Sequence, residues 1–218
     1  MELAAGPASH AREMGRRGLR SVAVDNSPGM VAYGRKRAAE DGVDLDYFEA
    51  DMAAFTIREP VDVAAILMDS LTGLLDNEAV LAHFNCVADA LTPGGVYVLE
   101  MQHPRDAFGA GTSAGTDWET ERDGTTVHMT WGRPDDPFDP VTQIARDTVT
   151  VAWRQGDEQG EITEVLPNRR SVVYEFRALV TASGRFEMVQ ELGSLDLGVP
   201  FSNAKDSWRH VPVLRRTG

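Results

Sequence analysis

Short apolar runs alternate with amphipathic stretches through the first hundred residues. The apolar runs are too short and too uniformly apolar to be one-sided surface strands, and the stretches between them have helical spacing. This alternation is typical of an α/β fold, in which a mostly parallel sheet carries helices on its faces. Ser27-Pro28 predicts a helix start and Pro93-Gly94-Gly95 a helix stop. Strands are predicted at 3–5, 21–25, 45–48, 61–68 and 96–101, and helices at 9–17, 28–40 and from a cap at Asp76 to about 91.

The pattern changes after residue 104. Residues 109–116 are rich in glycine, serine and threonine and predict a loop. Three β-like runs follow without intervening helices, so they are expected to pair antiparallel. We expect residues 1–104 and 177–218 to form the core, and 105–176 to form an antiparallel insertion that faces either the substrate or a second subunit. The runs are 125–131, 144–153 and 162–176; a short helix at 177–183 and a closing hairpin of 186–192 and 211–215 complete the prediction.

Composition narrows the classes of function. The 218 residues carry a net charge of −13, which disfavours nucleic acid as a partner because phosphate backbones would be repelled. The sequence shows no apolar run long enough for a membrane span and no basic-then-apolar leader. The one cysteine, Cys86, excludes an intrachain disulfide, so a reducing, cytoplasmic setting is expected. The five histidines are scattered, and no metal site is predicted.

The motifs at the strand ends resemble those of a known family, the class I, seven-stranded, Rossmann-like S-adenosylmethionine-dependent methyltransferases of the small-molecule type. The resemblance extends over nearly the whole chain and depends on the order of several motifs rather than on any one of them. It implies a doubly wound sheet that ends in an antiparallel hairpin, with the antiparallel insertion after the fifth strand. The motifs are Glu2-Leu3-Ala4-Ala5-Gly6-Pro7-Ala8, Val24-Asp25-Asn26-Ser27-Pro28-Gly29-Met30, Glu49-Ala50-Asp51-Met52, Asp69-Ser70-Leu71 and Leu91-Thr92-Pro93-Gly94-Gly95.

The resemblance implies S-adenosyl-L-methionine as the cofactor, bound beyond the carboxyl ends of the strands. Glu2 is expected to meet the amino group of the methionine portion, Asp25 the ribose hydroxyls, and Asp51 with Met52 the adenine. Each has a structural alternative: a frayed terminal acid, a helix cap, a turn acid and a core side chain, respectively. Gly6 would let the backbone approach the cofactor closely. The remaining expected cofactor contacts are Ala4, Asn26, Met30, Asp69 and Ser70.

Two departures from the family pattern matter. Ala4 and Ala8 stand where glycines are common, which is tolerable if the backbone there keeps negative φ. The helices that usually precede the first strand and cover the cofactor are expected to be lacking. An alternative is therefore a cofactor-binding protein with impaired catalysis, or a start assigned too far downstream. A nicotinamide-dependent oxidoreductase is a further alternative, although the Gly-x-Gly-x-x-Gly series is missing.

Methyl transfer asks little of the protein, because an in-line displacement can be driven mainly by proximity. His103 is the candidate general base, with a structural or substrate-orienting role as the alternative. The acceptor is expected to be a small molecule, and self-association as a homodimer stays open. Candidate acceptor contacts are Arg105, Phe108, Phe201 and Trp208; Trp118 and Trp131 either wall the pocket or form the insertion's own core.

Overall fold

The computed structural model describes residues 1–108 and 116–218. These residues form two compact units. The core unit comprises residues 1–71, 76–103 and 173–218, and the insertion unit comprises residues 72–75 and 104–172. No helix among the described residues is both long and apolar enough to cross a bilayer.

One mixed sheet organises the core unit. Its strand order is β12-β13-β5-β4-β1-β2-β3, and the short β6 pairs with β13. The pairs from β3 to β5 are parallel, whereas β13 is antiparallel to both β5 and β12. The predicted fold class, a parallel sheet closed by an antiparallel hairpin, is confirmed. The strands are β1 (Glu2–Leu3), β2 (Ser21–Asp25), β3 (Leu45–Glu49), β4 (Val61–Ile66), β5 (Leu91–Leu99), β6 (Met101–Gln102), β12 (Phe186–Leu192) and β13 (Arg209–Arg216).

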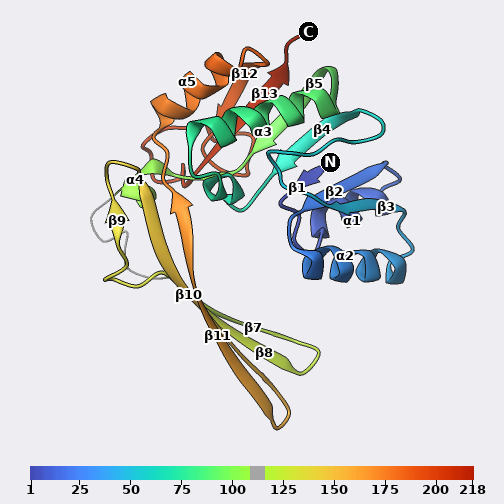
Figure 1. The fold of residues 1–218 in the computed structure, drawn as a ribbon, viewed down its shortest axis with the longest axis vertical. Coiled ribbons are helices and arrows are strands. Elements are labelled where there is room, and N and C mark those ends of the chain that lie inside the picture. Colours follow the sequence, from blue (N-terminus) through green and yellow to red (C-terminus); the bar gives the residue numbers. More distant parts are fainter. Residues whose placement is uncertain (109–115) are drawn as a thin grey trace. The chain divides into compact units, whose positions relative to one another are not determined.

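The strand order reverses between β1 and β4. From β1 the chain moves outward through β2 to β3, and from β4 it moves the other way to β5. Right-handed crossovers in opposite directions place the two sets of helices on opposite faces of the sheet (Figure 1). Ligands of such sheets bind at the carboxyl ends of the strands beside this reversal. The helices are α1 (Ser9–Arg16) and α2 (Pro28–Glu40), which contact β2 and β3, and α3 (Asn77–Ala90) and α5 (Val173–Ser183), which contact each other.

Two helix caps agree with the sequence prediction. The Ser27 hydroxyl accepts a hydrogen bond from Met30 N at 3.3 Å, and the Asp76 carboxylate accepts one from Ala79 N at 2.7 Å. Each satisfies a backbone donor that the first turn of a helix leaves unpaired.

Several element boundaries in the structure differ from the prediction. The third predicted run ends at Arg169, and α5 begins at Val173, because Phe176, Leu179 and Val180 are buried with helical spacing. β5 starts directly after α3, at Leu91 rather than at 96. Strands β7 (Thr116–Arg122) and β9 (Phe138–Asp139) and the short helix α4 (Pro104–Phe108) were not predicted.

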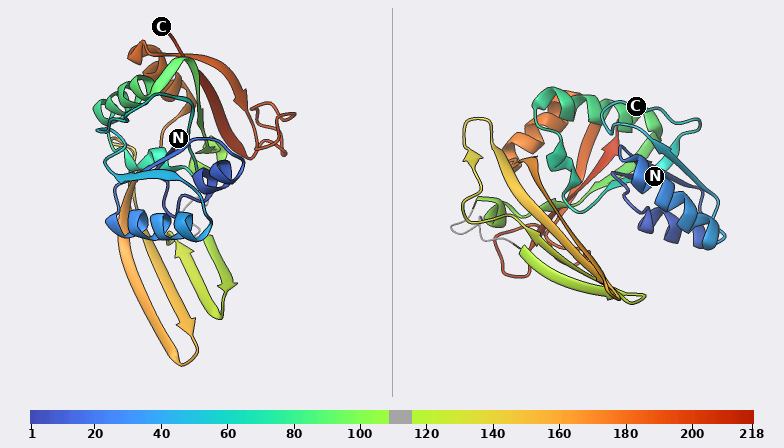
Figure 2. Two further views of the ribbon diagram at one scale, coloured as in Figure 1. Left: turned by 90° about the vertical axis from the view of Figure 1, so that its right-hand side faces the viewer. Right: turned by 60° about the horizontal axis from the view of Figure 1, so that its bottom comes forward.

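The insertion unit is built on a five-stranded antiparallel sheet. Its order is β11-β10-β8-β7, and β9 pairs with β10. Figure 2 shows the β7–β8 and β10–β11 hairpins running side by side. The predicted antiparallel pairing is confirmed. The elements are α4 (Pro104–Phe108), β7 (Thr116–Arg122), β8 (Thr125–Trp131), β9 (Phe138–Asp139), β10 (Ile144–Gln155) and β11 (Glu158–Arg169).

Candidate functional site

The turn between β1 and α1 follows the carboxyl end of β1. This strand is one of the two, β1 and β4, between which the strand order of the sheet reverses. Ala4, Gly6 and Ala8 all have left-handed backbone conformations, with φ of 48°, 52° and 54°. The expectation that the two alanines keep negative φ is therefore wrong. Three left-handed residues within five positions turn the chain from β1 into α1. A left-handed alanine costs about 1–2 kcal/mol of conformational energy.

Contacts from outside the turn stabilise it. Asp25 Oδ2 accepts a hydrogen bond from Gly6 N at 2.7 Å, and the Tyr47 hydroxyl donates one to Gly6 O. Arg12 Nε donates to Pro7 O at 3.2 Å. Both backbone groups of Gly6 are thus fixed by side chains from β2 and β3.

Tyr47, which supports the turn through Gly6 O, was not predicted from the sequence. It is almost fully buried, and burial, together with the nearby charges of Asp25 and Glu2, raises the pKa of its hydroxyl. The hydroxyl therefore remains a donor. Its ring lies directly beneath Gly34 of α2, where an added Cβ would lie 2.9 Å from Tyr47 Cδ1. The available signal was a tyrosine in β3, a strand expected to end at the same edge of the sheet as the turn that contains Gly6.

Both carboxylate oxygens of Asp25 accept hydrogen bonds from backbone N–H groups at the site. Besides that from Gly6 N, Asp25 accepts a hydrogen bond from Ser27 N at 2.9 Å through Oδ1. A carboxylate oxygen can accept two hydrogen bonds, so these contacts leave acceptor capacity for ligand hydroxyls. Asn26 and Met30, the neighbouring predicted contacts, are exposed at the same strand end.

Glu2 is buried and serves α1. Its Oε2 accepts a hydrogen bond from Ala11 N at 2.8 Å, and its Oε1 pairs with His10 Nδ1 at 2.8 Å. The N-cap residue of α1, Ala8, has no side chain able to cap. Glu2 supplies this cap, with its negative charge at the positive end of the helix. Its predicted role toward the methionine amino group stays a prediction.

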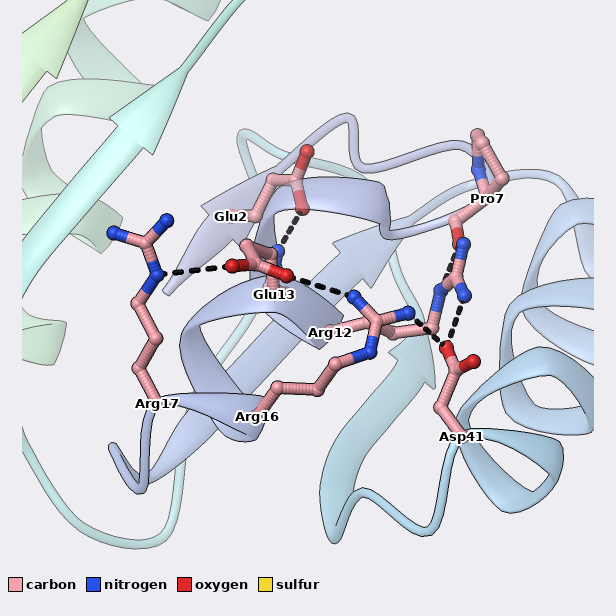
Figure 3. A network of polar contacts seen from close by, with 8 residues as sticks. Glu2, Pro7, Arg12, Glu13, Arg16, Arg17 and Asp41 are labelled. Carbon is pink, nitrogen blue, oxygen red and sulfur yellow. Dashed lines mark hydrogen bonds and ion pairs between the residues drawn. The ribbon is translucent and has the colours of Figure 1, made fainter.

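A charged network attaches α1 to the end of α2 (Figure 3). Arg12 and Arg16 both bind Asp41 Oδ2, the Arg16 contact at 2.7 Å. These hydrogen bonds hold the pKa of Asp41 below its usual value. Glu13 binds Arg16 and Arg17 at 2.8 and 2.9 Å on the exposed side of α1. Because Arg12 also holds Pro7 O, the network fixes the turn as well as the helix.

The loop after β3 carries Asp51 and Met52. Asp51 Oδ1 accepts a hydrogen bond from Ala53 N at 2.7 Å, as a turn acid does. From α3, His83 Nδ1 donates to Met52 O at 2.8 Å and Cys86 Sγ donates to Ala53 O at 3.3 Å. One face of α3 therefore fixes this loop.

His83 is fully buried, and its Nε2 accepts a hydrogen bond from the Tyr97 hydroxyl at 2.6 Å. Burial lowers its pKa to about 4, so the imidazole is neutral at physiological pH. His83 therefore has a structural role, linking α3 to the loop after β3 and to Tyr97.

Two carboxylates lie beyond the ends of β4 and β5. Asp69 Oδ1 accepts a hydrogen bond from Gln102 N at 2.9 Å, and Glu100 Oε2 accepts one from Met68 N at 3.0 Å. Arg209 Nε forms an ion pair with Glu100 Oε1 at 3.0 Å. Burial raises the pKa of Asp69 to about 6. The sequence analysis missed Glu100, although an acid that ends an apolar strand was a usable signal.

Ser70 and Asp69 occupy a strained turn. Met68 and Asp69 have φ of 56° and 59°, and the Ser70 hydroxyl donates to Leu67 O at 2.8 Å. Non-glycine residues in this region persist where their surroundings impose the conformation, often at functional sites.

His103 is buried after β6. Its Nε2 lies 3.0 Å from Ser202 O. A carbonyl oxygen only accepts, so Nε2 carries a proton in this contact, and a general base here would act through Nδ1. Phe201 lies between two histidines, with ring centroids 5.3 Å from His103 and 4.2 Å from His210. Trp208 is half exposed, with the Arg209 guanidinium 5.0 Å from its ring centroid.

The other two predicted acceptor contacts belong to the insertion unit. Arg105 forms an ion pair with its neighbour in the sequence, Asp106, at 3.8 Å. Phe108 packs edge-on against Phe138, with ring centroids 6.4 Å apart. Their role toward an acceptor stays a prediction. Across residues 1–108 and 116–218, no group of three or more histidine, cysteine or acidic side chains is arranged to hold a metal ion.

Comparison with known proteins gives a consistent result. Residues 1–95 match a family described as methyltransferase domain. No curated protein sequence matches the chain.

Among solved structures, an S-adenosylmethionine-dependent methyltransferase from Clostridium acetobutylicum ATCC 824 is 15% identical, with a TM-score of 0.81 over 100% of this chain and 83% of its own. The sugar N-methyltransferase KedS8 from Streptoalloteichus sp. ATCC 53650 is 18% identical, with a TM-score of 0.75 over 100% and 79%. CalS10, an amino pentose methyltransferase from Micromonospora echinaspora solved with S-adenosylmethionine bound, is 19% identical, with a TM-score of 0.72 over 99% and 82%.

The strand order β3-β2-β1-β4-β5-β13-β12, the acids at the strand ends and these matches agree with one another. Residues 1–95 thus match a methyltransferase-domain family, and the chain has the Rossmann-like fold of the solved S-adenosylmethionine-dependent methyltransferases to which it is similar.

Proposed function

We propose that the protein transfers the methyl group of S-adenosyl-L-methionine to a small-molecule acceptor. The observation that carries the proposal is the Gly6 turn, which lies at the sheet reversal and is held open by Asp25 and Tyr47. A Cβ added to Gly6 would meet no atom within 4 Å, so the outer side of the turn is free for a ligand to approach. The surrounding carboxylates suit a ligand that carries an ammonium and a sulfonium group.

We assign each part of S-adenosyl-L-methionine to different residues at the strand ends. Asp25 would accept both ribose hydroxyls, the loop of Asp51 and Met52 would border the adenine, and Glu2 would face the amino group. The backbone at Asp69 and Ser70 would border the methionine portion near the methyl group. Ala4, Asn26 and Met30 would complete the contacts.

The cofactor supplies an activated methyl group when it is bound. The protein's part is to hold the acceptor in line and to exclude water, an effect worth up to ~7–11 kcal/mol. An acceptor that arrives protonated needs a base, and His103 through Nδ1 is the residue that we propose for that step. Arg105, Phe108, Phe201 and Trp208 are proposed as acceptor contacts.

The proposed class of acceptor is supported by the substrates named for solved structures that share this fold. Solved structures with this fold include a sugar N-methyltransferase and a glycopeptide N-methyltransferase. A net charge of −13 agrees with a free small molecule rather than a nucleic acid. A cytoplasmic location is part of the proposal, because the single cysteine cannot form an intrachain disulfide.

Isothermal titration of the purified chain with S-adenosylmethionine, S-adenosylhomocysteine and NADH tests the cofactor. We expect micromolar binding of the two adenosyl ligands and none of NADH. Asp25→Ala should weaken S-adenosylmethionine binding by roughly tenfold to a hundredfold, since a hydrogen bond to a charged group contributes ~1.5–3 kcal/mol. Asp157→Ala, in the exposed turn between β10 and β11, is the control and should leave binding unchanged. Equal effects of the two variants would exclude the ribose contact.

A second assay separates binding from turnover. Formation of S-adenosylhomocysteine is followed with a panel of amino sugars and small amines as acceptors. Turnover above the acceptor-free background supports methyl transfer. Tight cofactor binding without turnover on any member of the panel would favour the catalytically impaired alternative.

A further inference from the structure

The sheet of the insertion unit has two faces of very different chemistry. Residues opposite each other in an antiparallel ladder point to the same face, and the register of β7, β8, β10 and β11 has no bulge. Alternate residues can therefore be assigned to faces without ambiguity. One face, here called the apolar face, consists of four rows across the strands in the order β7, β8, β10, β11. The rows are Arg122-Thr125-Gln155-Glu158, Thr120-Val127-Trp153-Gly160, Trp118-Met129-Val151-Ile162 and Thr116-Trp131-Val149-Glu164.

The opposite face is polar. It carries Glu119, His128, Arg154 and Glu161, and His128 pairs there with Asp117 at 2.8 Å. A sheet with one apolar and one polar face normally covers a core with the apolar one. The apolar face of this sheet instead leaves large side chains in solvent: Trp118 is 41% exposed, Trp131 38% and Ile162 61%.

The apolar face is ordered by its own contacts. Trp153 lies across Gly160, whose added Cβ would be 2.7 Å from Trp153 Nε1. Trp131 Nε1 donates to Asp147 Oδ2 at 3.2 Å on the same face. These contacts hold two indoles in place before any partner arrives, which lowers the entropy cost of association.

We propose that the apolar face binds the same face of a second copy of this chain, forming a two-fold symmetric dimer of stacked sheets. A two-fold axis parallel to the strands exchanges β7 with β11 and β8 with β10 within each row. Arg122 then lies opposite the partner's Glu158 at both ends of the first row. Trp118 meets the partner's Ile162, and Met129 meets the partner's Val151.

The complementarity holds in size as well as charge. In the second row, the Trp153 ring, which lies across Gly160, meets the partner's Val127 and Thr120, so a large residue meets smaller ones. Such pairing lets two inner faces interdigitate at the ~10 Å spacing of stacked sheets. A two-fold axis perpendicular to the strands would instead bring Glu158 opposite the partner's Glu164. Like charges disfavour that arrangement.

The apolar face has the size of a small interaction surface. Three strand spacings of ~4.8 Å and six residue spacings of ~3.4 Å give a face about 14 Å by 20 Å between outer Cα atoms, or about 280 Å² before the side chains at its margins are added. This is below the ~800 Å² per partner that complexes of standard size bury, so we expect a dimer of modest affinity. Exposed apolar patches of several hundred Å² on a monomer commonly mark such interfaces.

Ile162 and Val165 provide a matched test. Both lie on β11 and are similarly exposed, 61% and 56%, but Ile162 belongs to the apolar face and Val165 to the polar one. Sedimentation velocity over a concentration series should give the wild-type chain twice the 23.8 kDa mass of one subunit. Ile162→Lys should raise the dimer dissociation constant at least ~30-fold, because it buries a charge in the interface. Val165→Lys should leave it unchanged.

A charge exchange tests the axis. Arg122 and Glu158 are on the outer strands, about 14 Å apart within one chain, so they do not pair there. Arg122→Glu and Glu158→Arg should each raise the dissociation constant about tenfold, and the double variant should recover to within ~3-fold of the wild type. As a control, Arg154→Glu on the polar face should have no effect.

Three results would overturn the proposal. These are a monomeric wild type at ~100 μM, well above the micromolar range of a specific interface, equal effects of Ile162→Lys and Val165→Lys, or a double charge exchange that dissociates the dimer further. A monomer would indicate that the apolar face serves another occupant, such as the acceptor. Cofactor titration is an independent readout, because the apolar face includes no residue proposed to bind S-adenosylmethionine.

Discussion

Gly34 offers a sharp test of how the turn after β1 is supported. The residue lies in the middle of α2, where alanine would normally stabilise a helix by ~0.8–1.0 kcal/mol. At Gly34, however, an added Cβ would lie 2.9 Å from Tyr47 Cδ1, nearer still to Cε1, and 3.3 Å from Pro7 O. Overpacking of this kind costs ~1–3 kcal/mol. We expect Gly34→Ala to destabilise the core unit by roughly 0.5–2 kcal/mol, a fall in Tm of roughly 1–8 °C for a chain of this length.

The same change should reach the site. A displaced Tyr47 ring weakens the hydrogen bond to Gly6 O, so S-adenosylmethionine affinity should fall about tenfold. Gly29→Ala, in the same helix, is the control, because its added Cβ meets only Ser27 Oγ at 3.8 Å. Thermal unfolding with and without S-adenosylmethionine measures both effects. If Gly34→Ala matched Gly29→Ala in Tm and affinity, the confinement of Tyr47 by α2 would be refuted. In a Tyr47→Leu background the penalty of Gly34→Ala should largely disappear.

Two further predictions concern buried histidines. Because burial lowers the pKa of His83 to about 4, the unfolded chain takes up a proton first as the pH falls, and stability present above pH 6.5 is lost towards pH 4. Urea unfolding should show the wild type losing about 3 kcal/mol more than His83→Gln between pH 7 and pH 4; parallel pH profiles would contradict a neutral, buried His83. His103→Ala should lower turnover more than S-adenosylmethionine affinity, and His103→Gln, which can still donate to Ser202 O, distinguishes the roles. Full recovery of turnover in the glutamine variant would remove His103 as a base and leave it as an anchor for the loop.

The sequence predicted the sheet because its central strands, β2 and β4, are mostly apolar and two of its helices carry recognisable caps. Asp25 and Asp51 were selected as candidates for the same reason, since acids at strand ends stand out against apolar runs. Tyr47, Glu100 and Arg209 were missed because their roles arise from contacts between segments far apart in the sequence. β7 was missed because it is a polar edge strand whose pattern resembles a loop. The φ values of Ala4 and Ala8 could not be read from residue types, because the surrounding contacts impose a conformation that alanine disfavours.

The left-handed alanines have a thermodynamic consequence for the ligand. A turn built of glycines loses its remaining backbone freedom when a ligand binds, and ordering one residue costs ~1–2 kcal/mol. Here Asp25, Arg12 and Tyr47 have already ordered the turn, so that cost falls on folding rather than on binding. Association should therefore be fast and show a small entropy penalty, and amide hydrogen exchange at Gly6 should be slow before any cofactor is added.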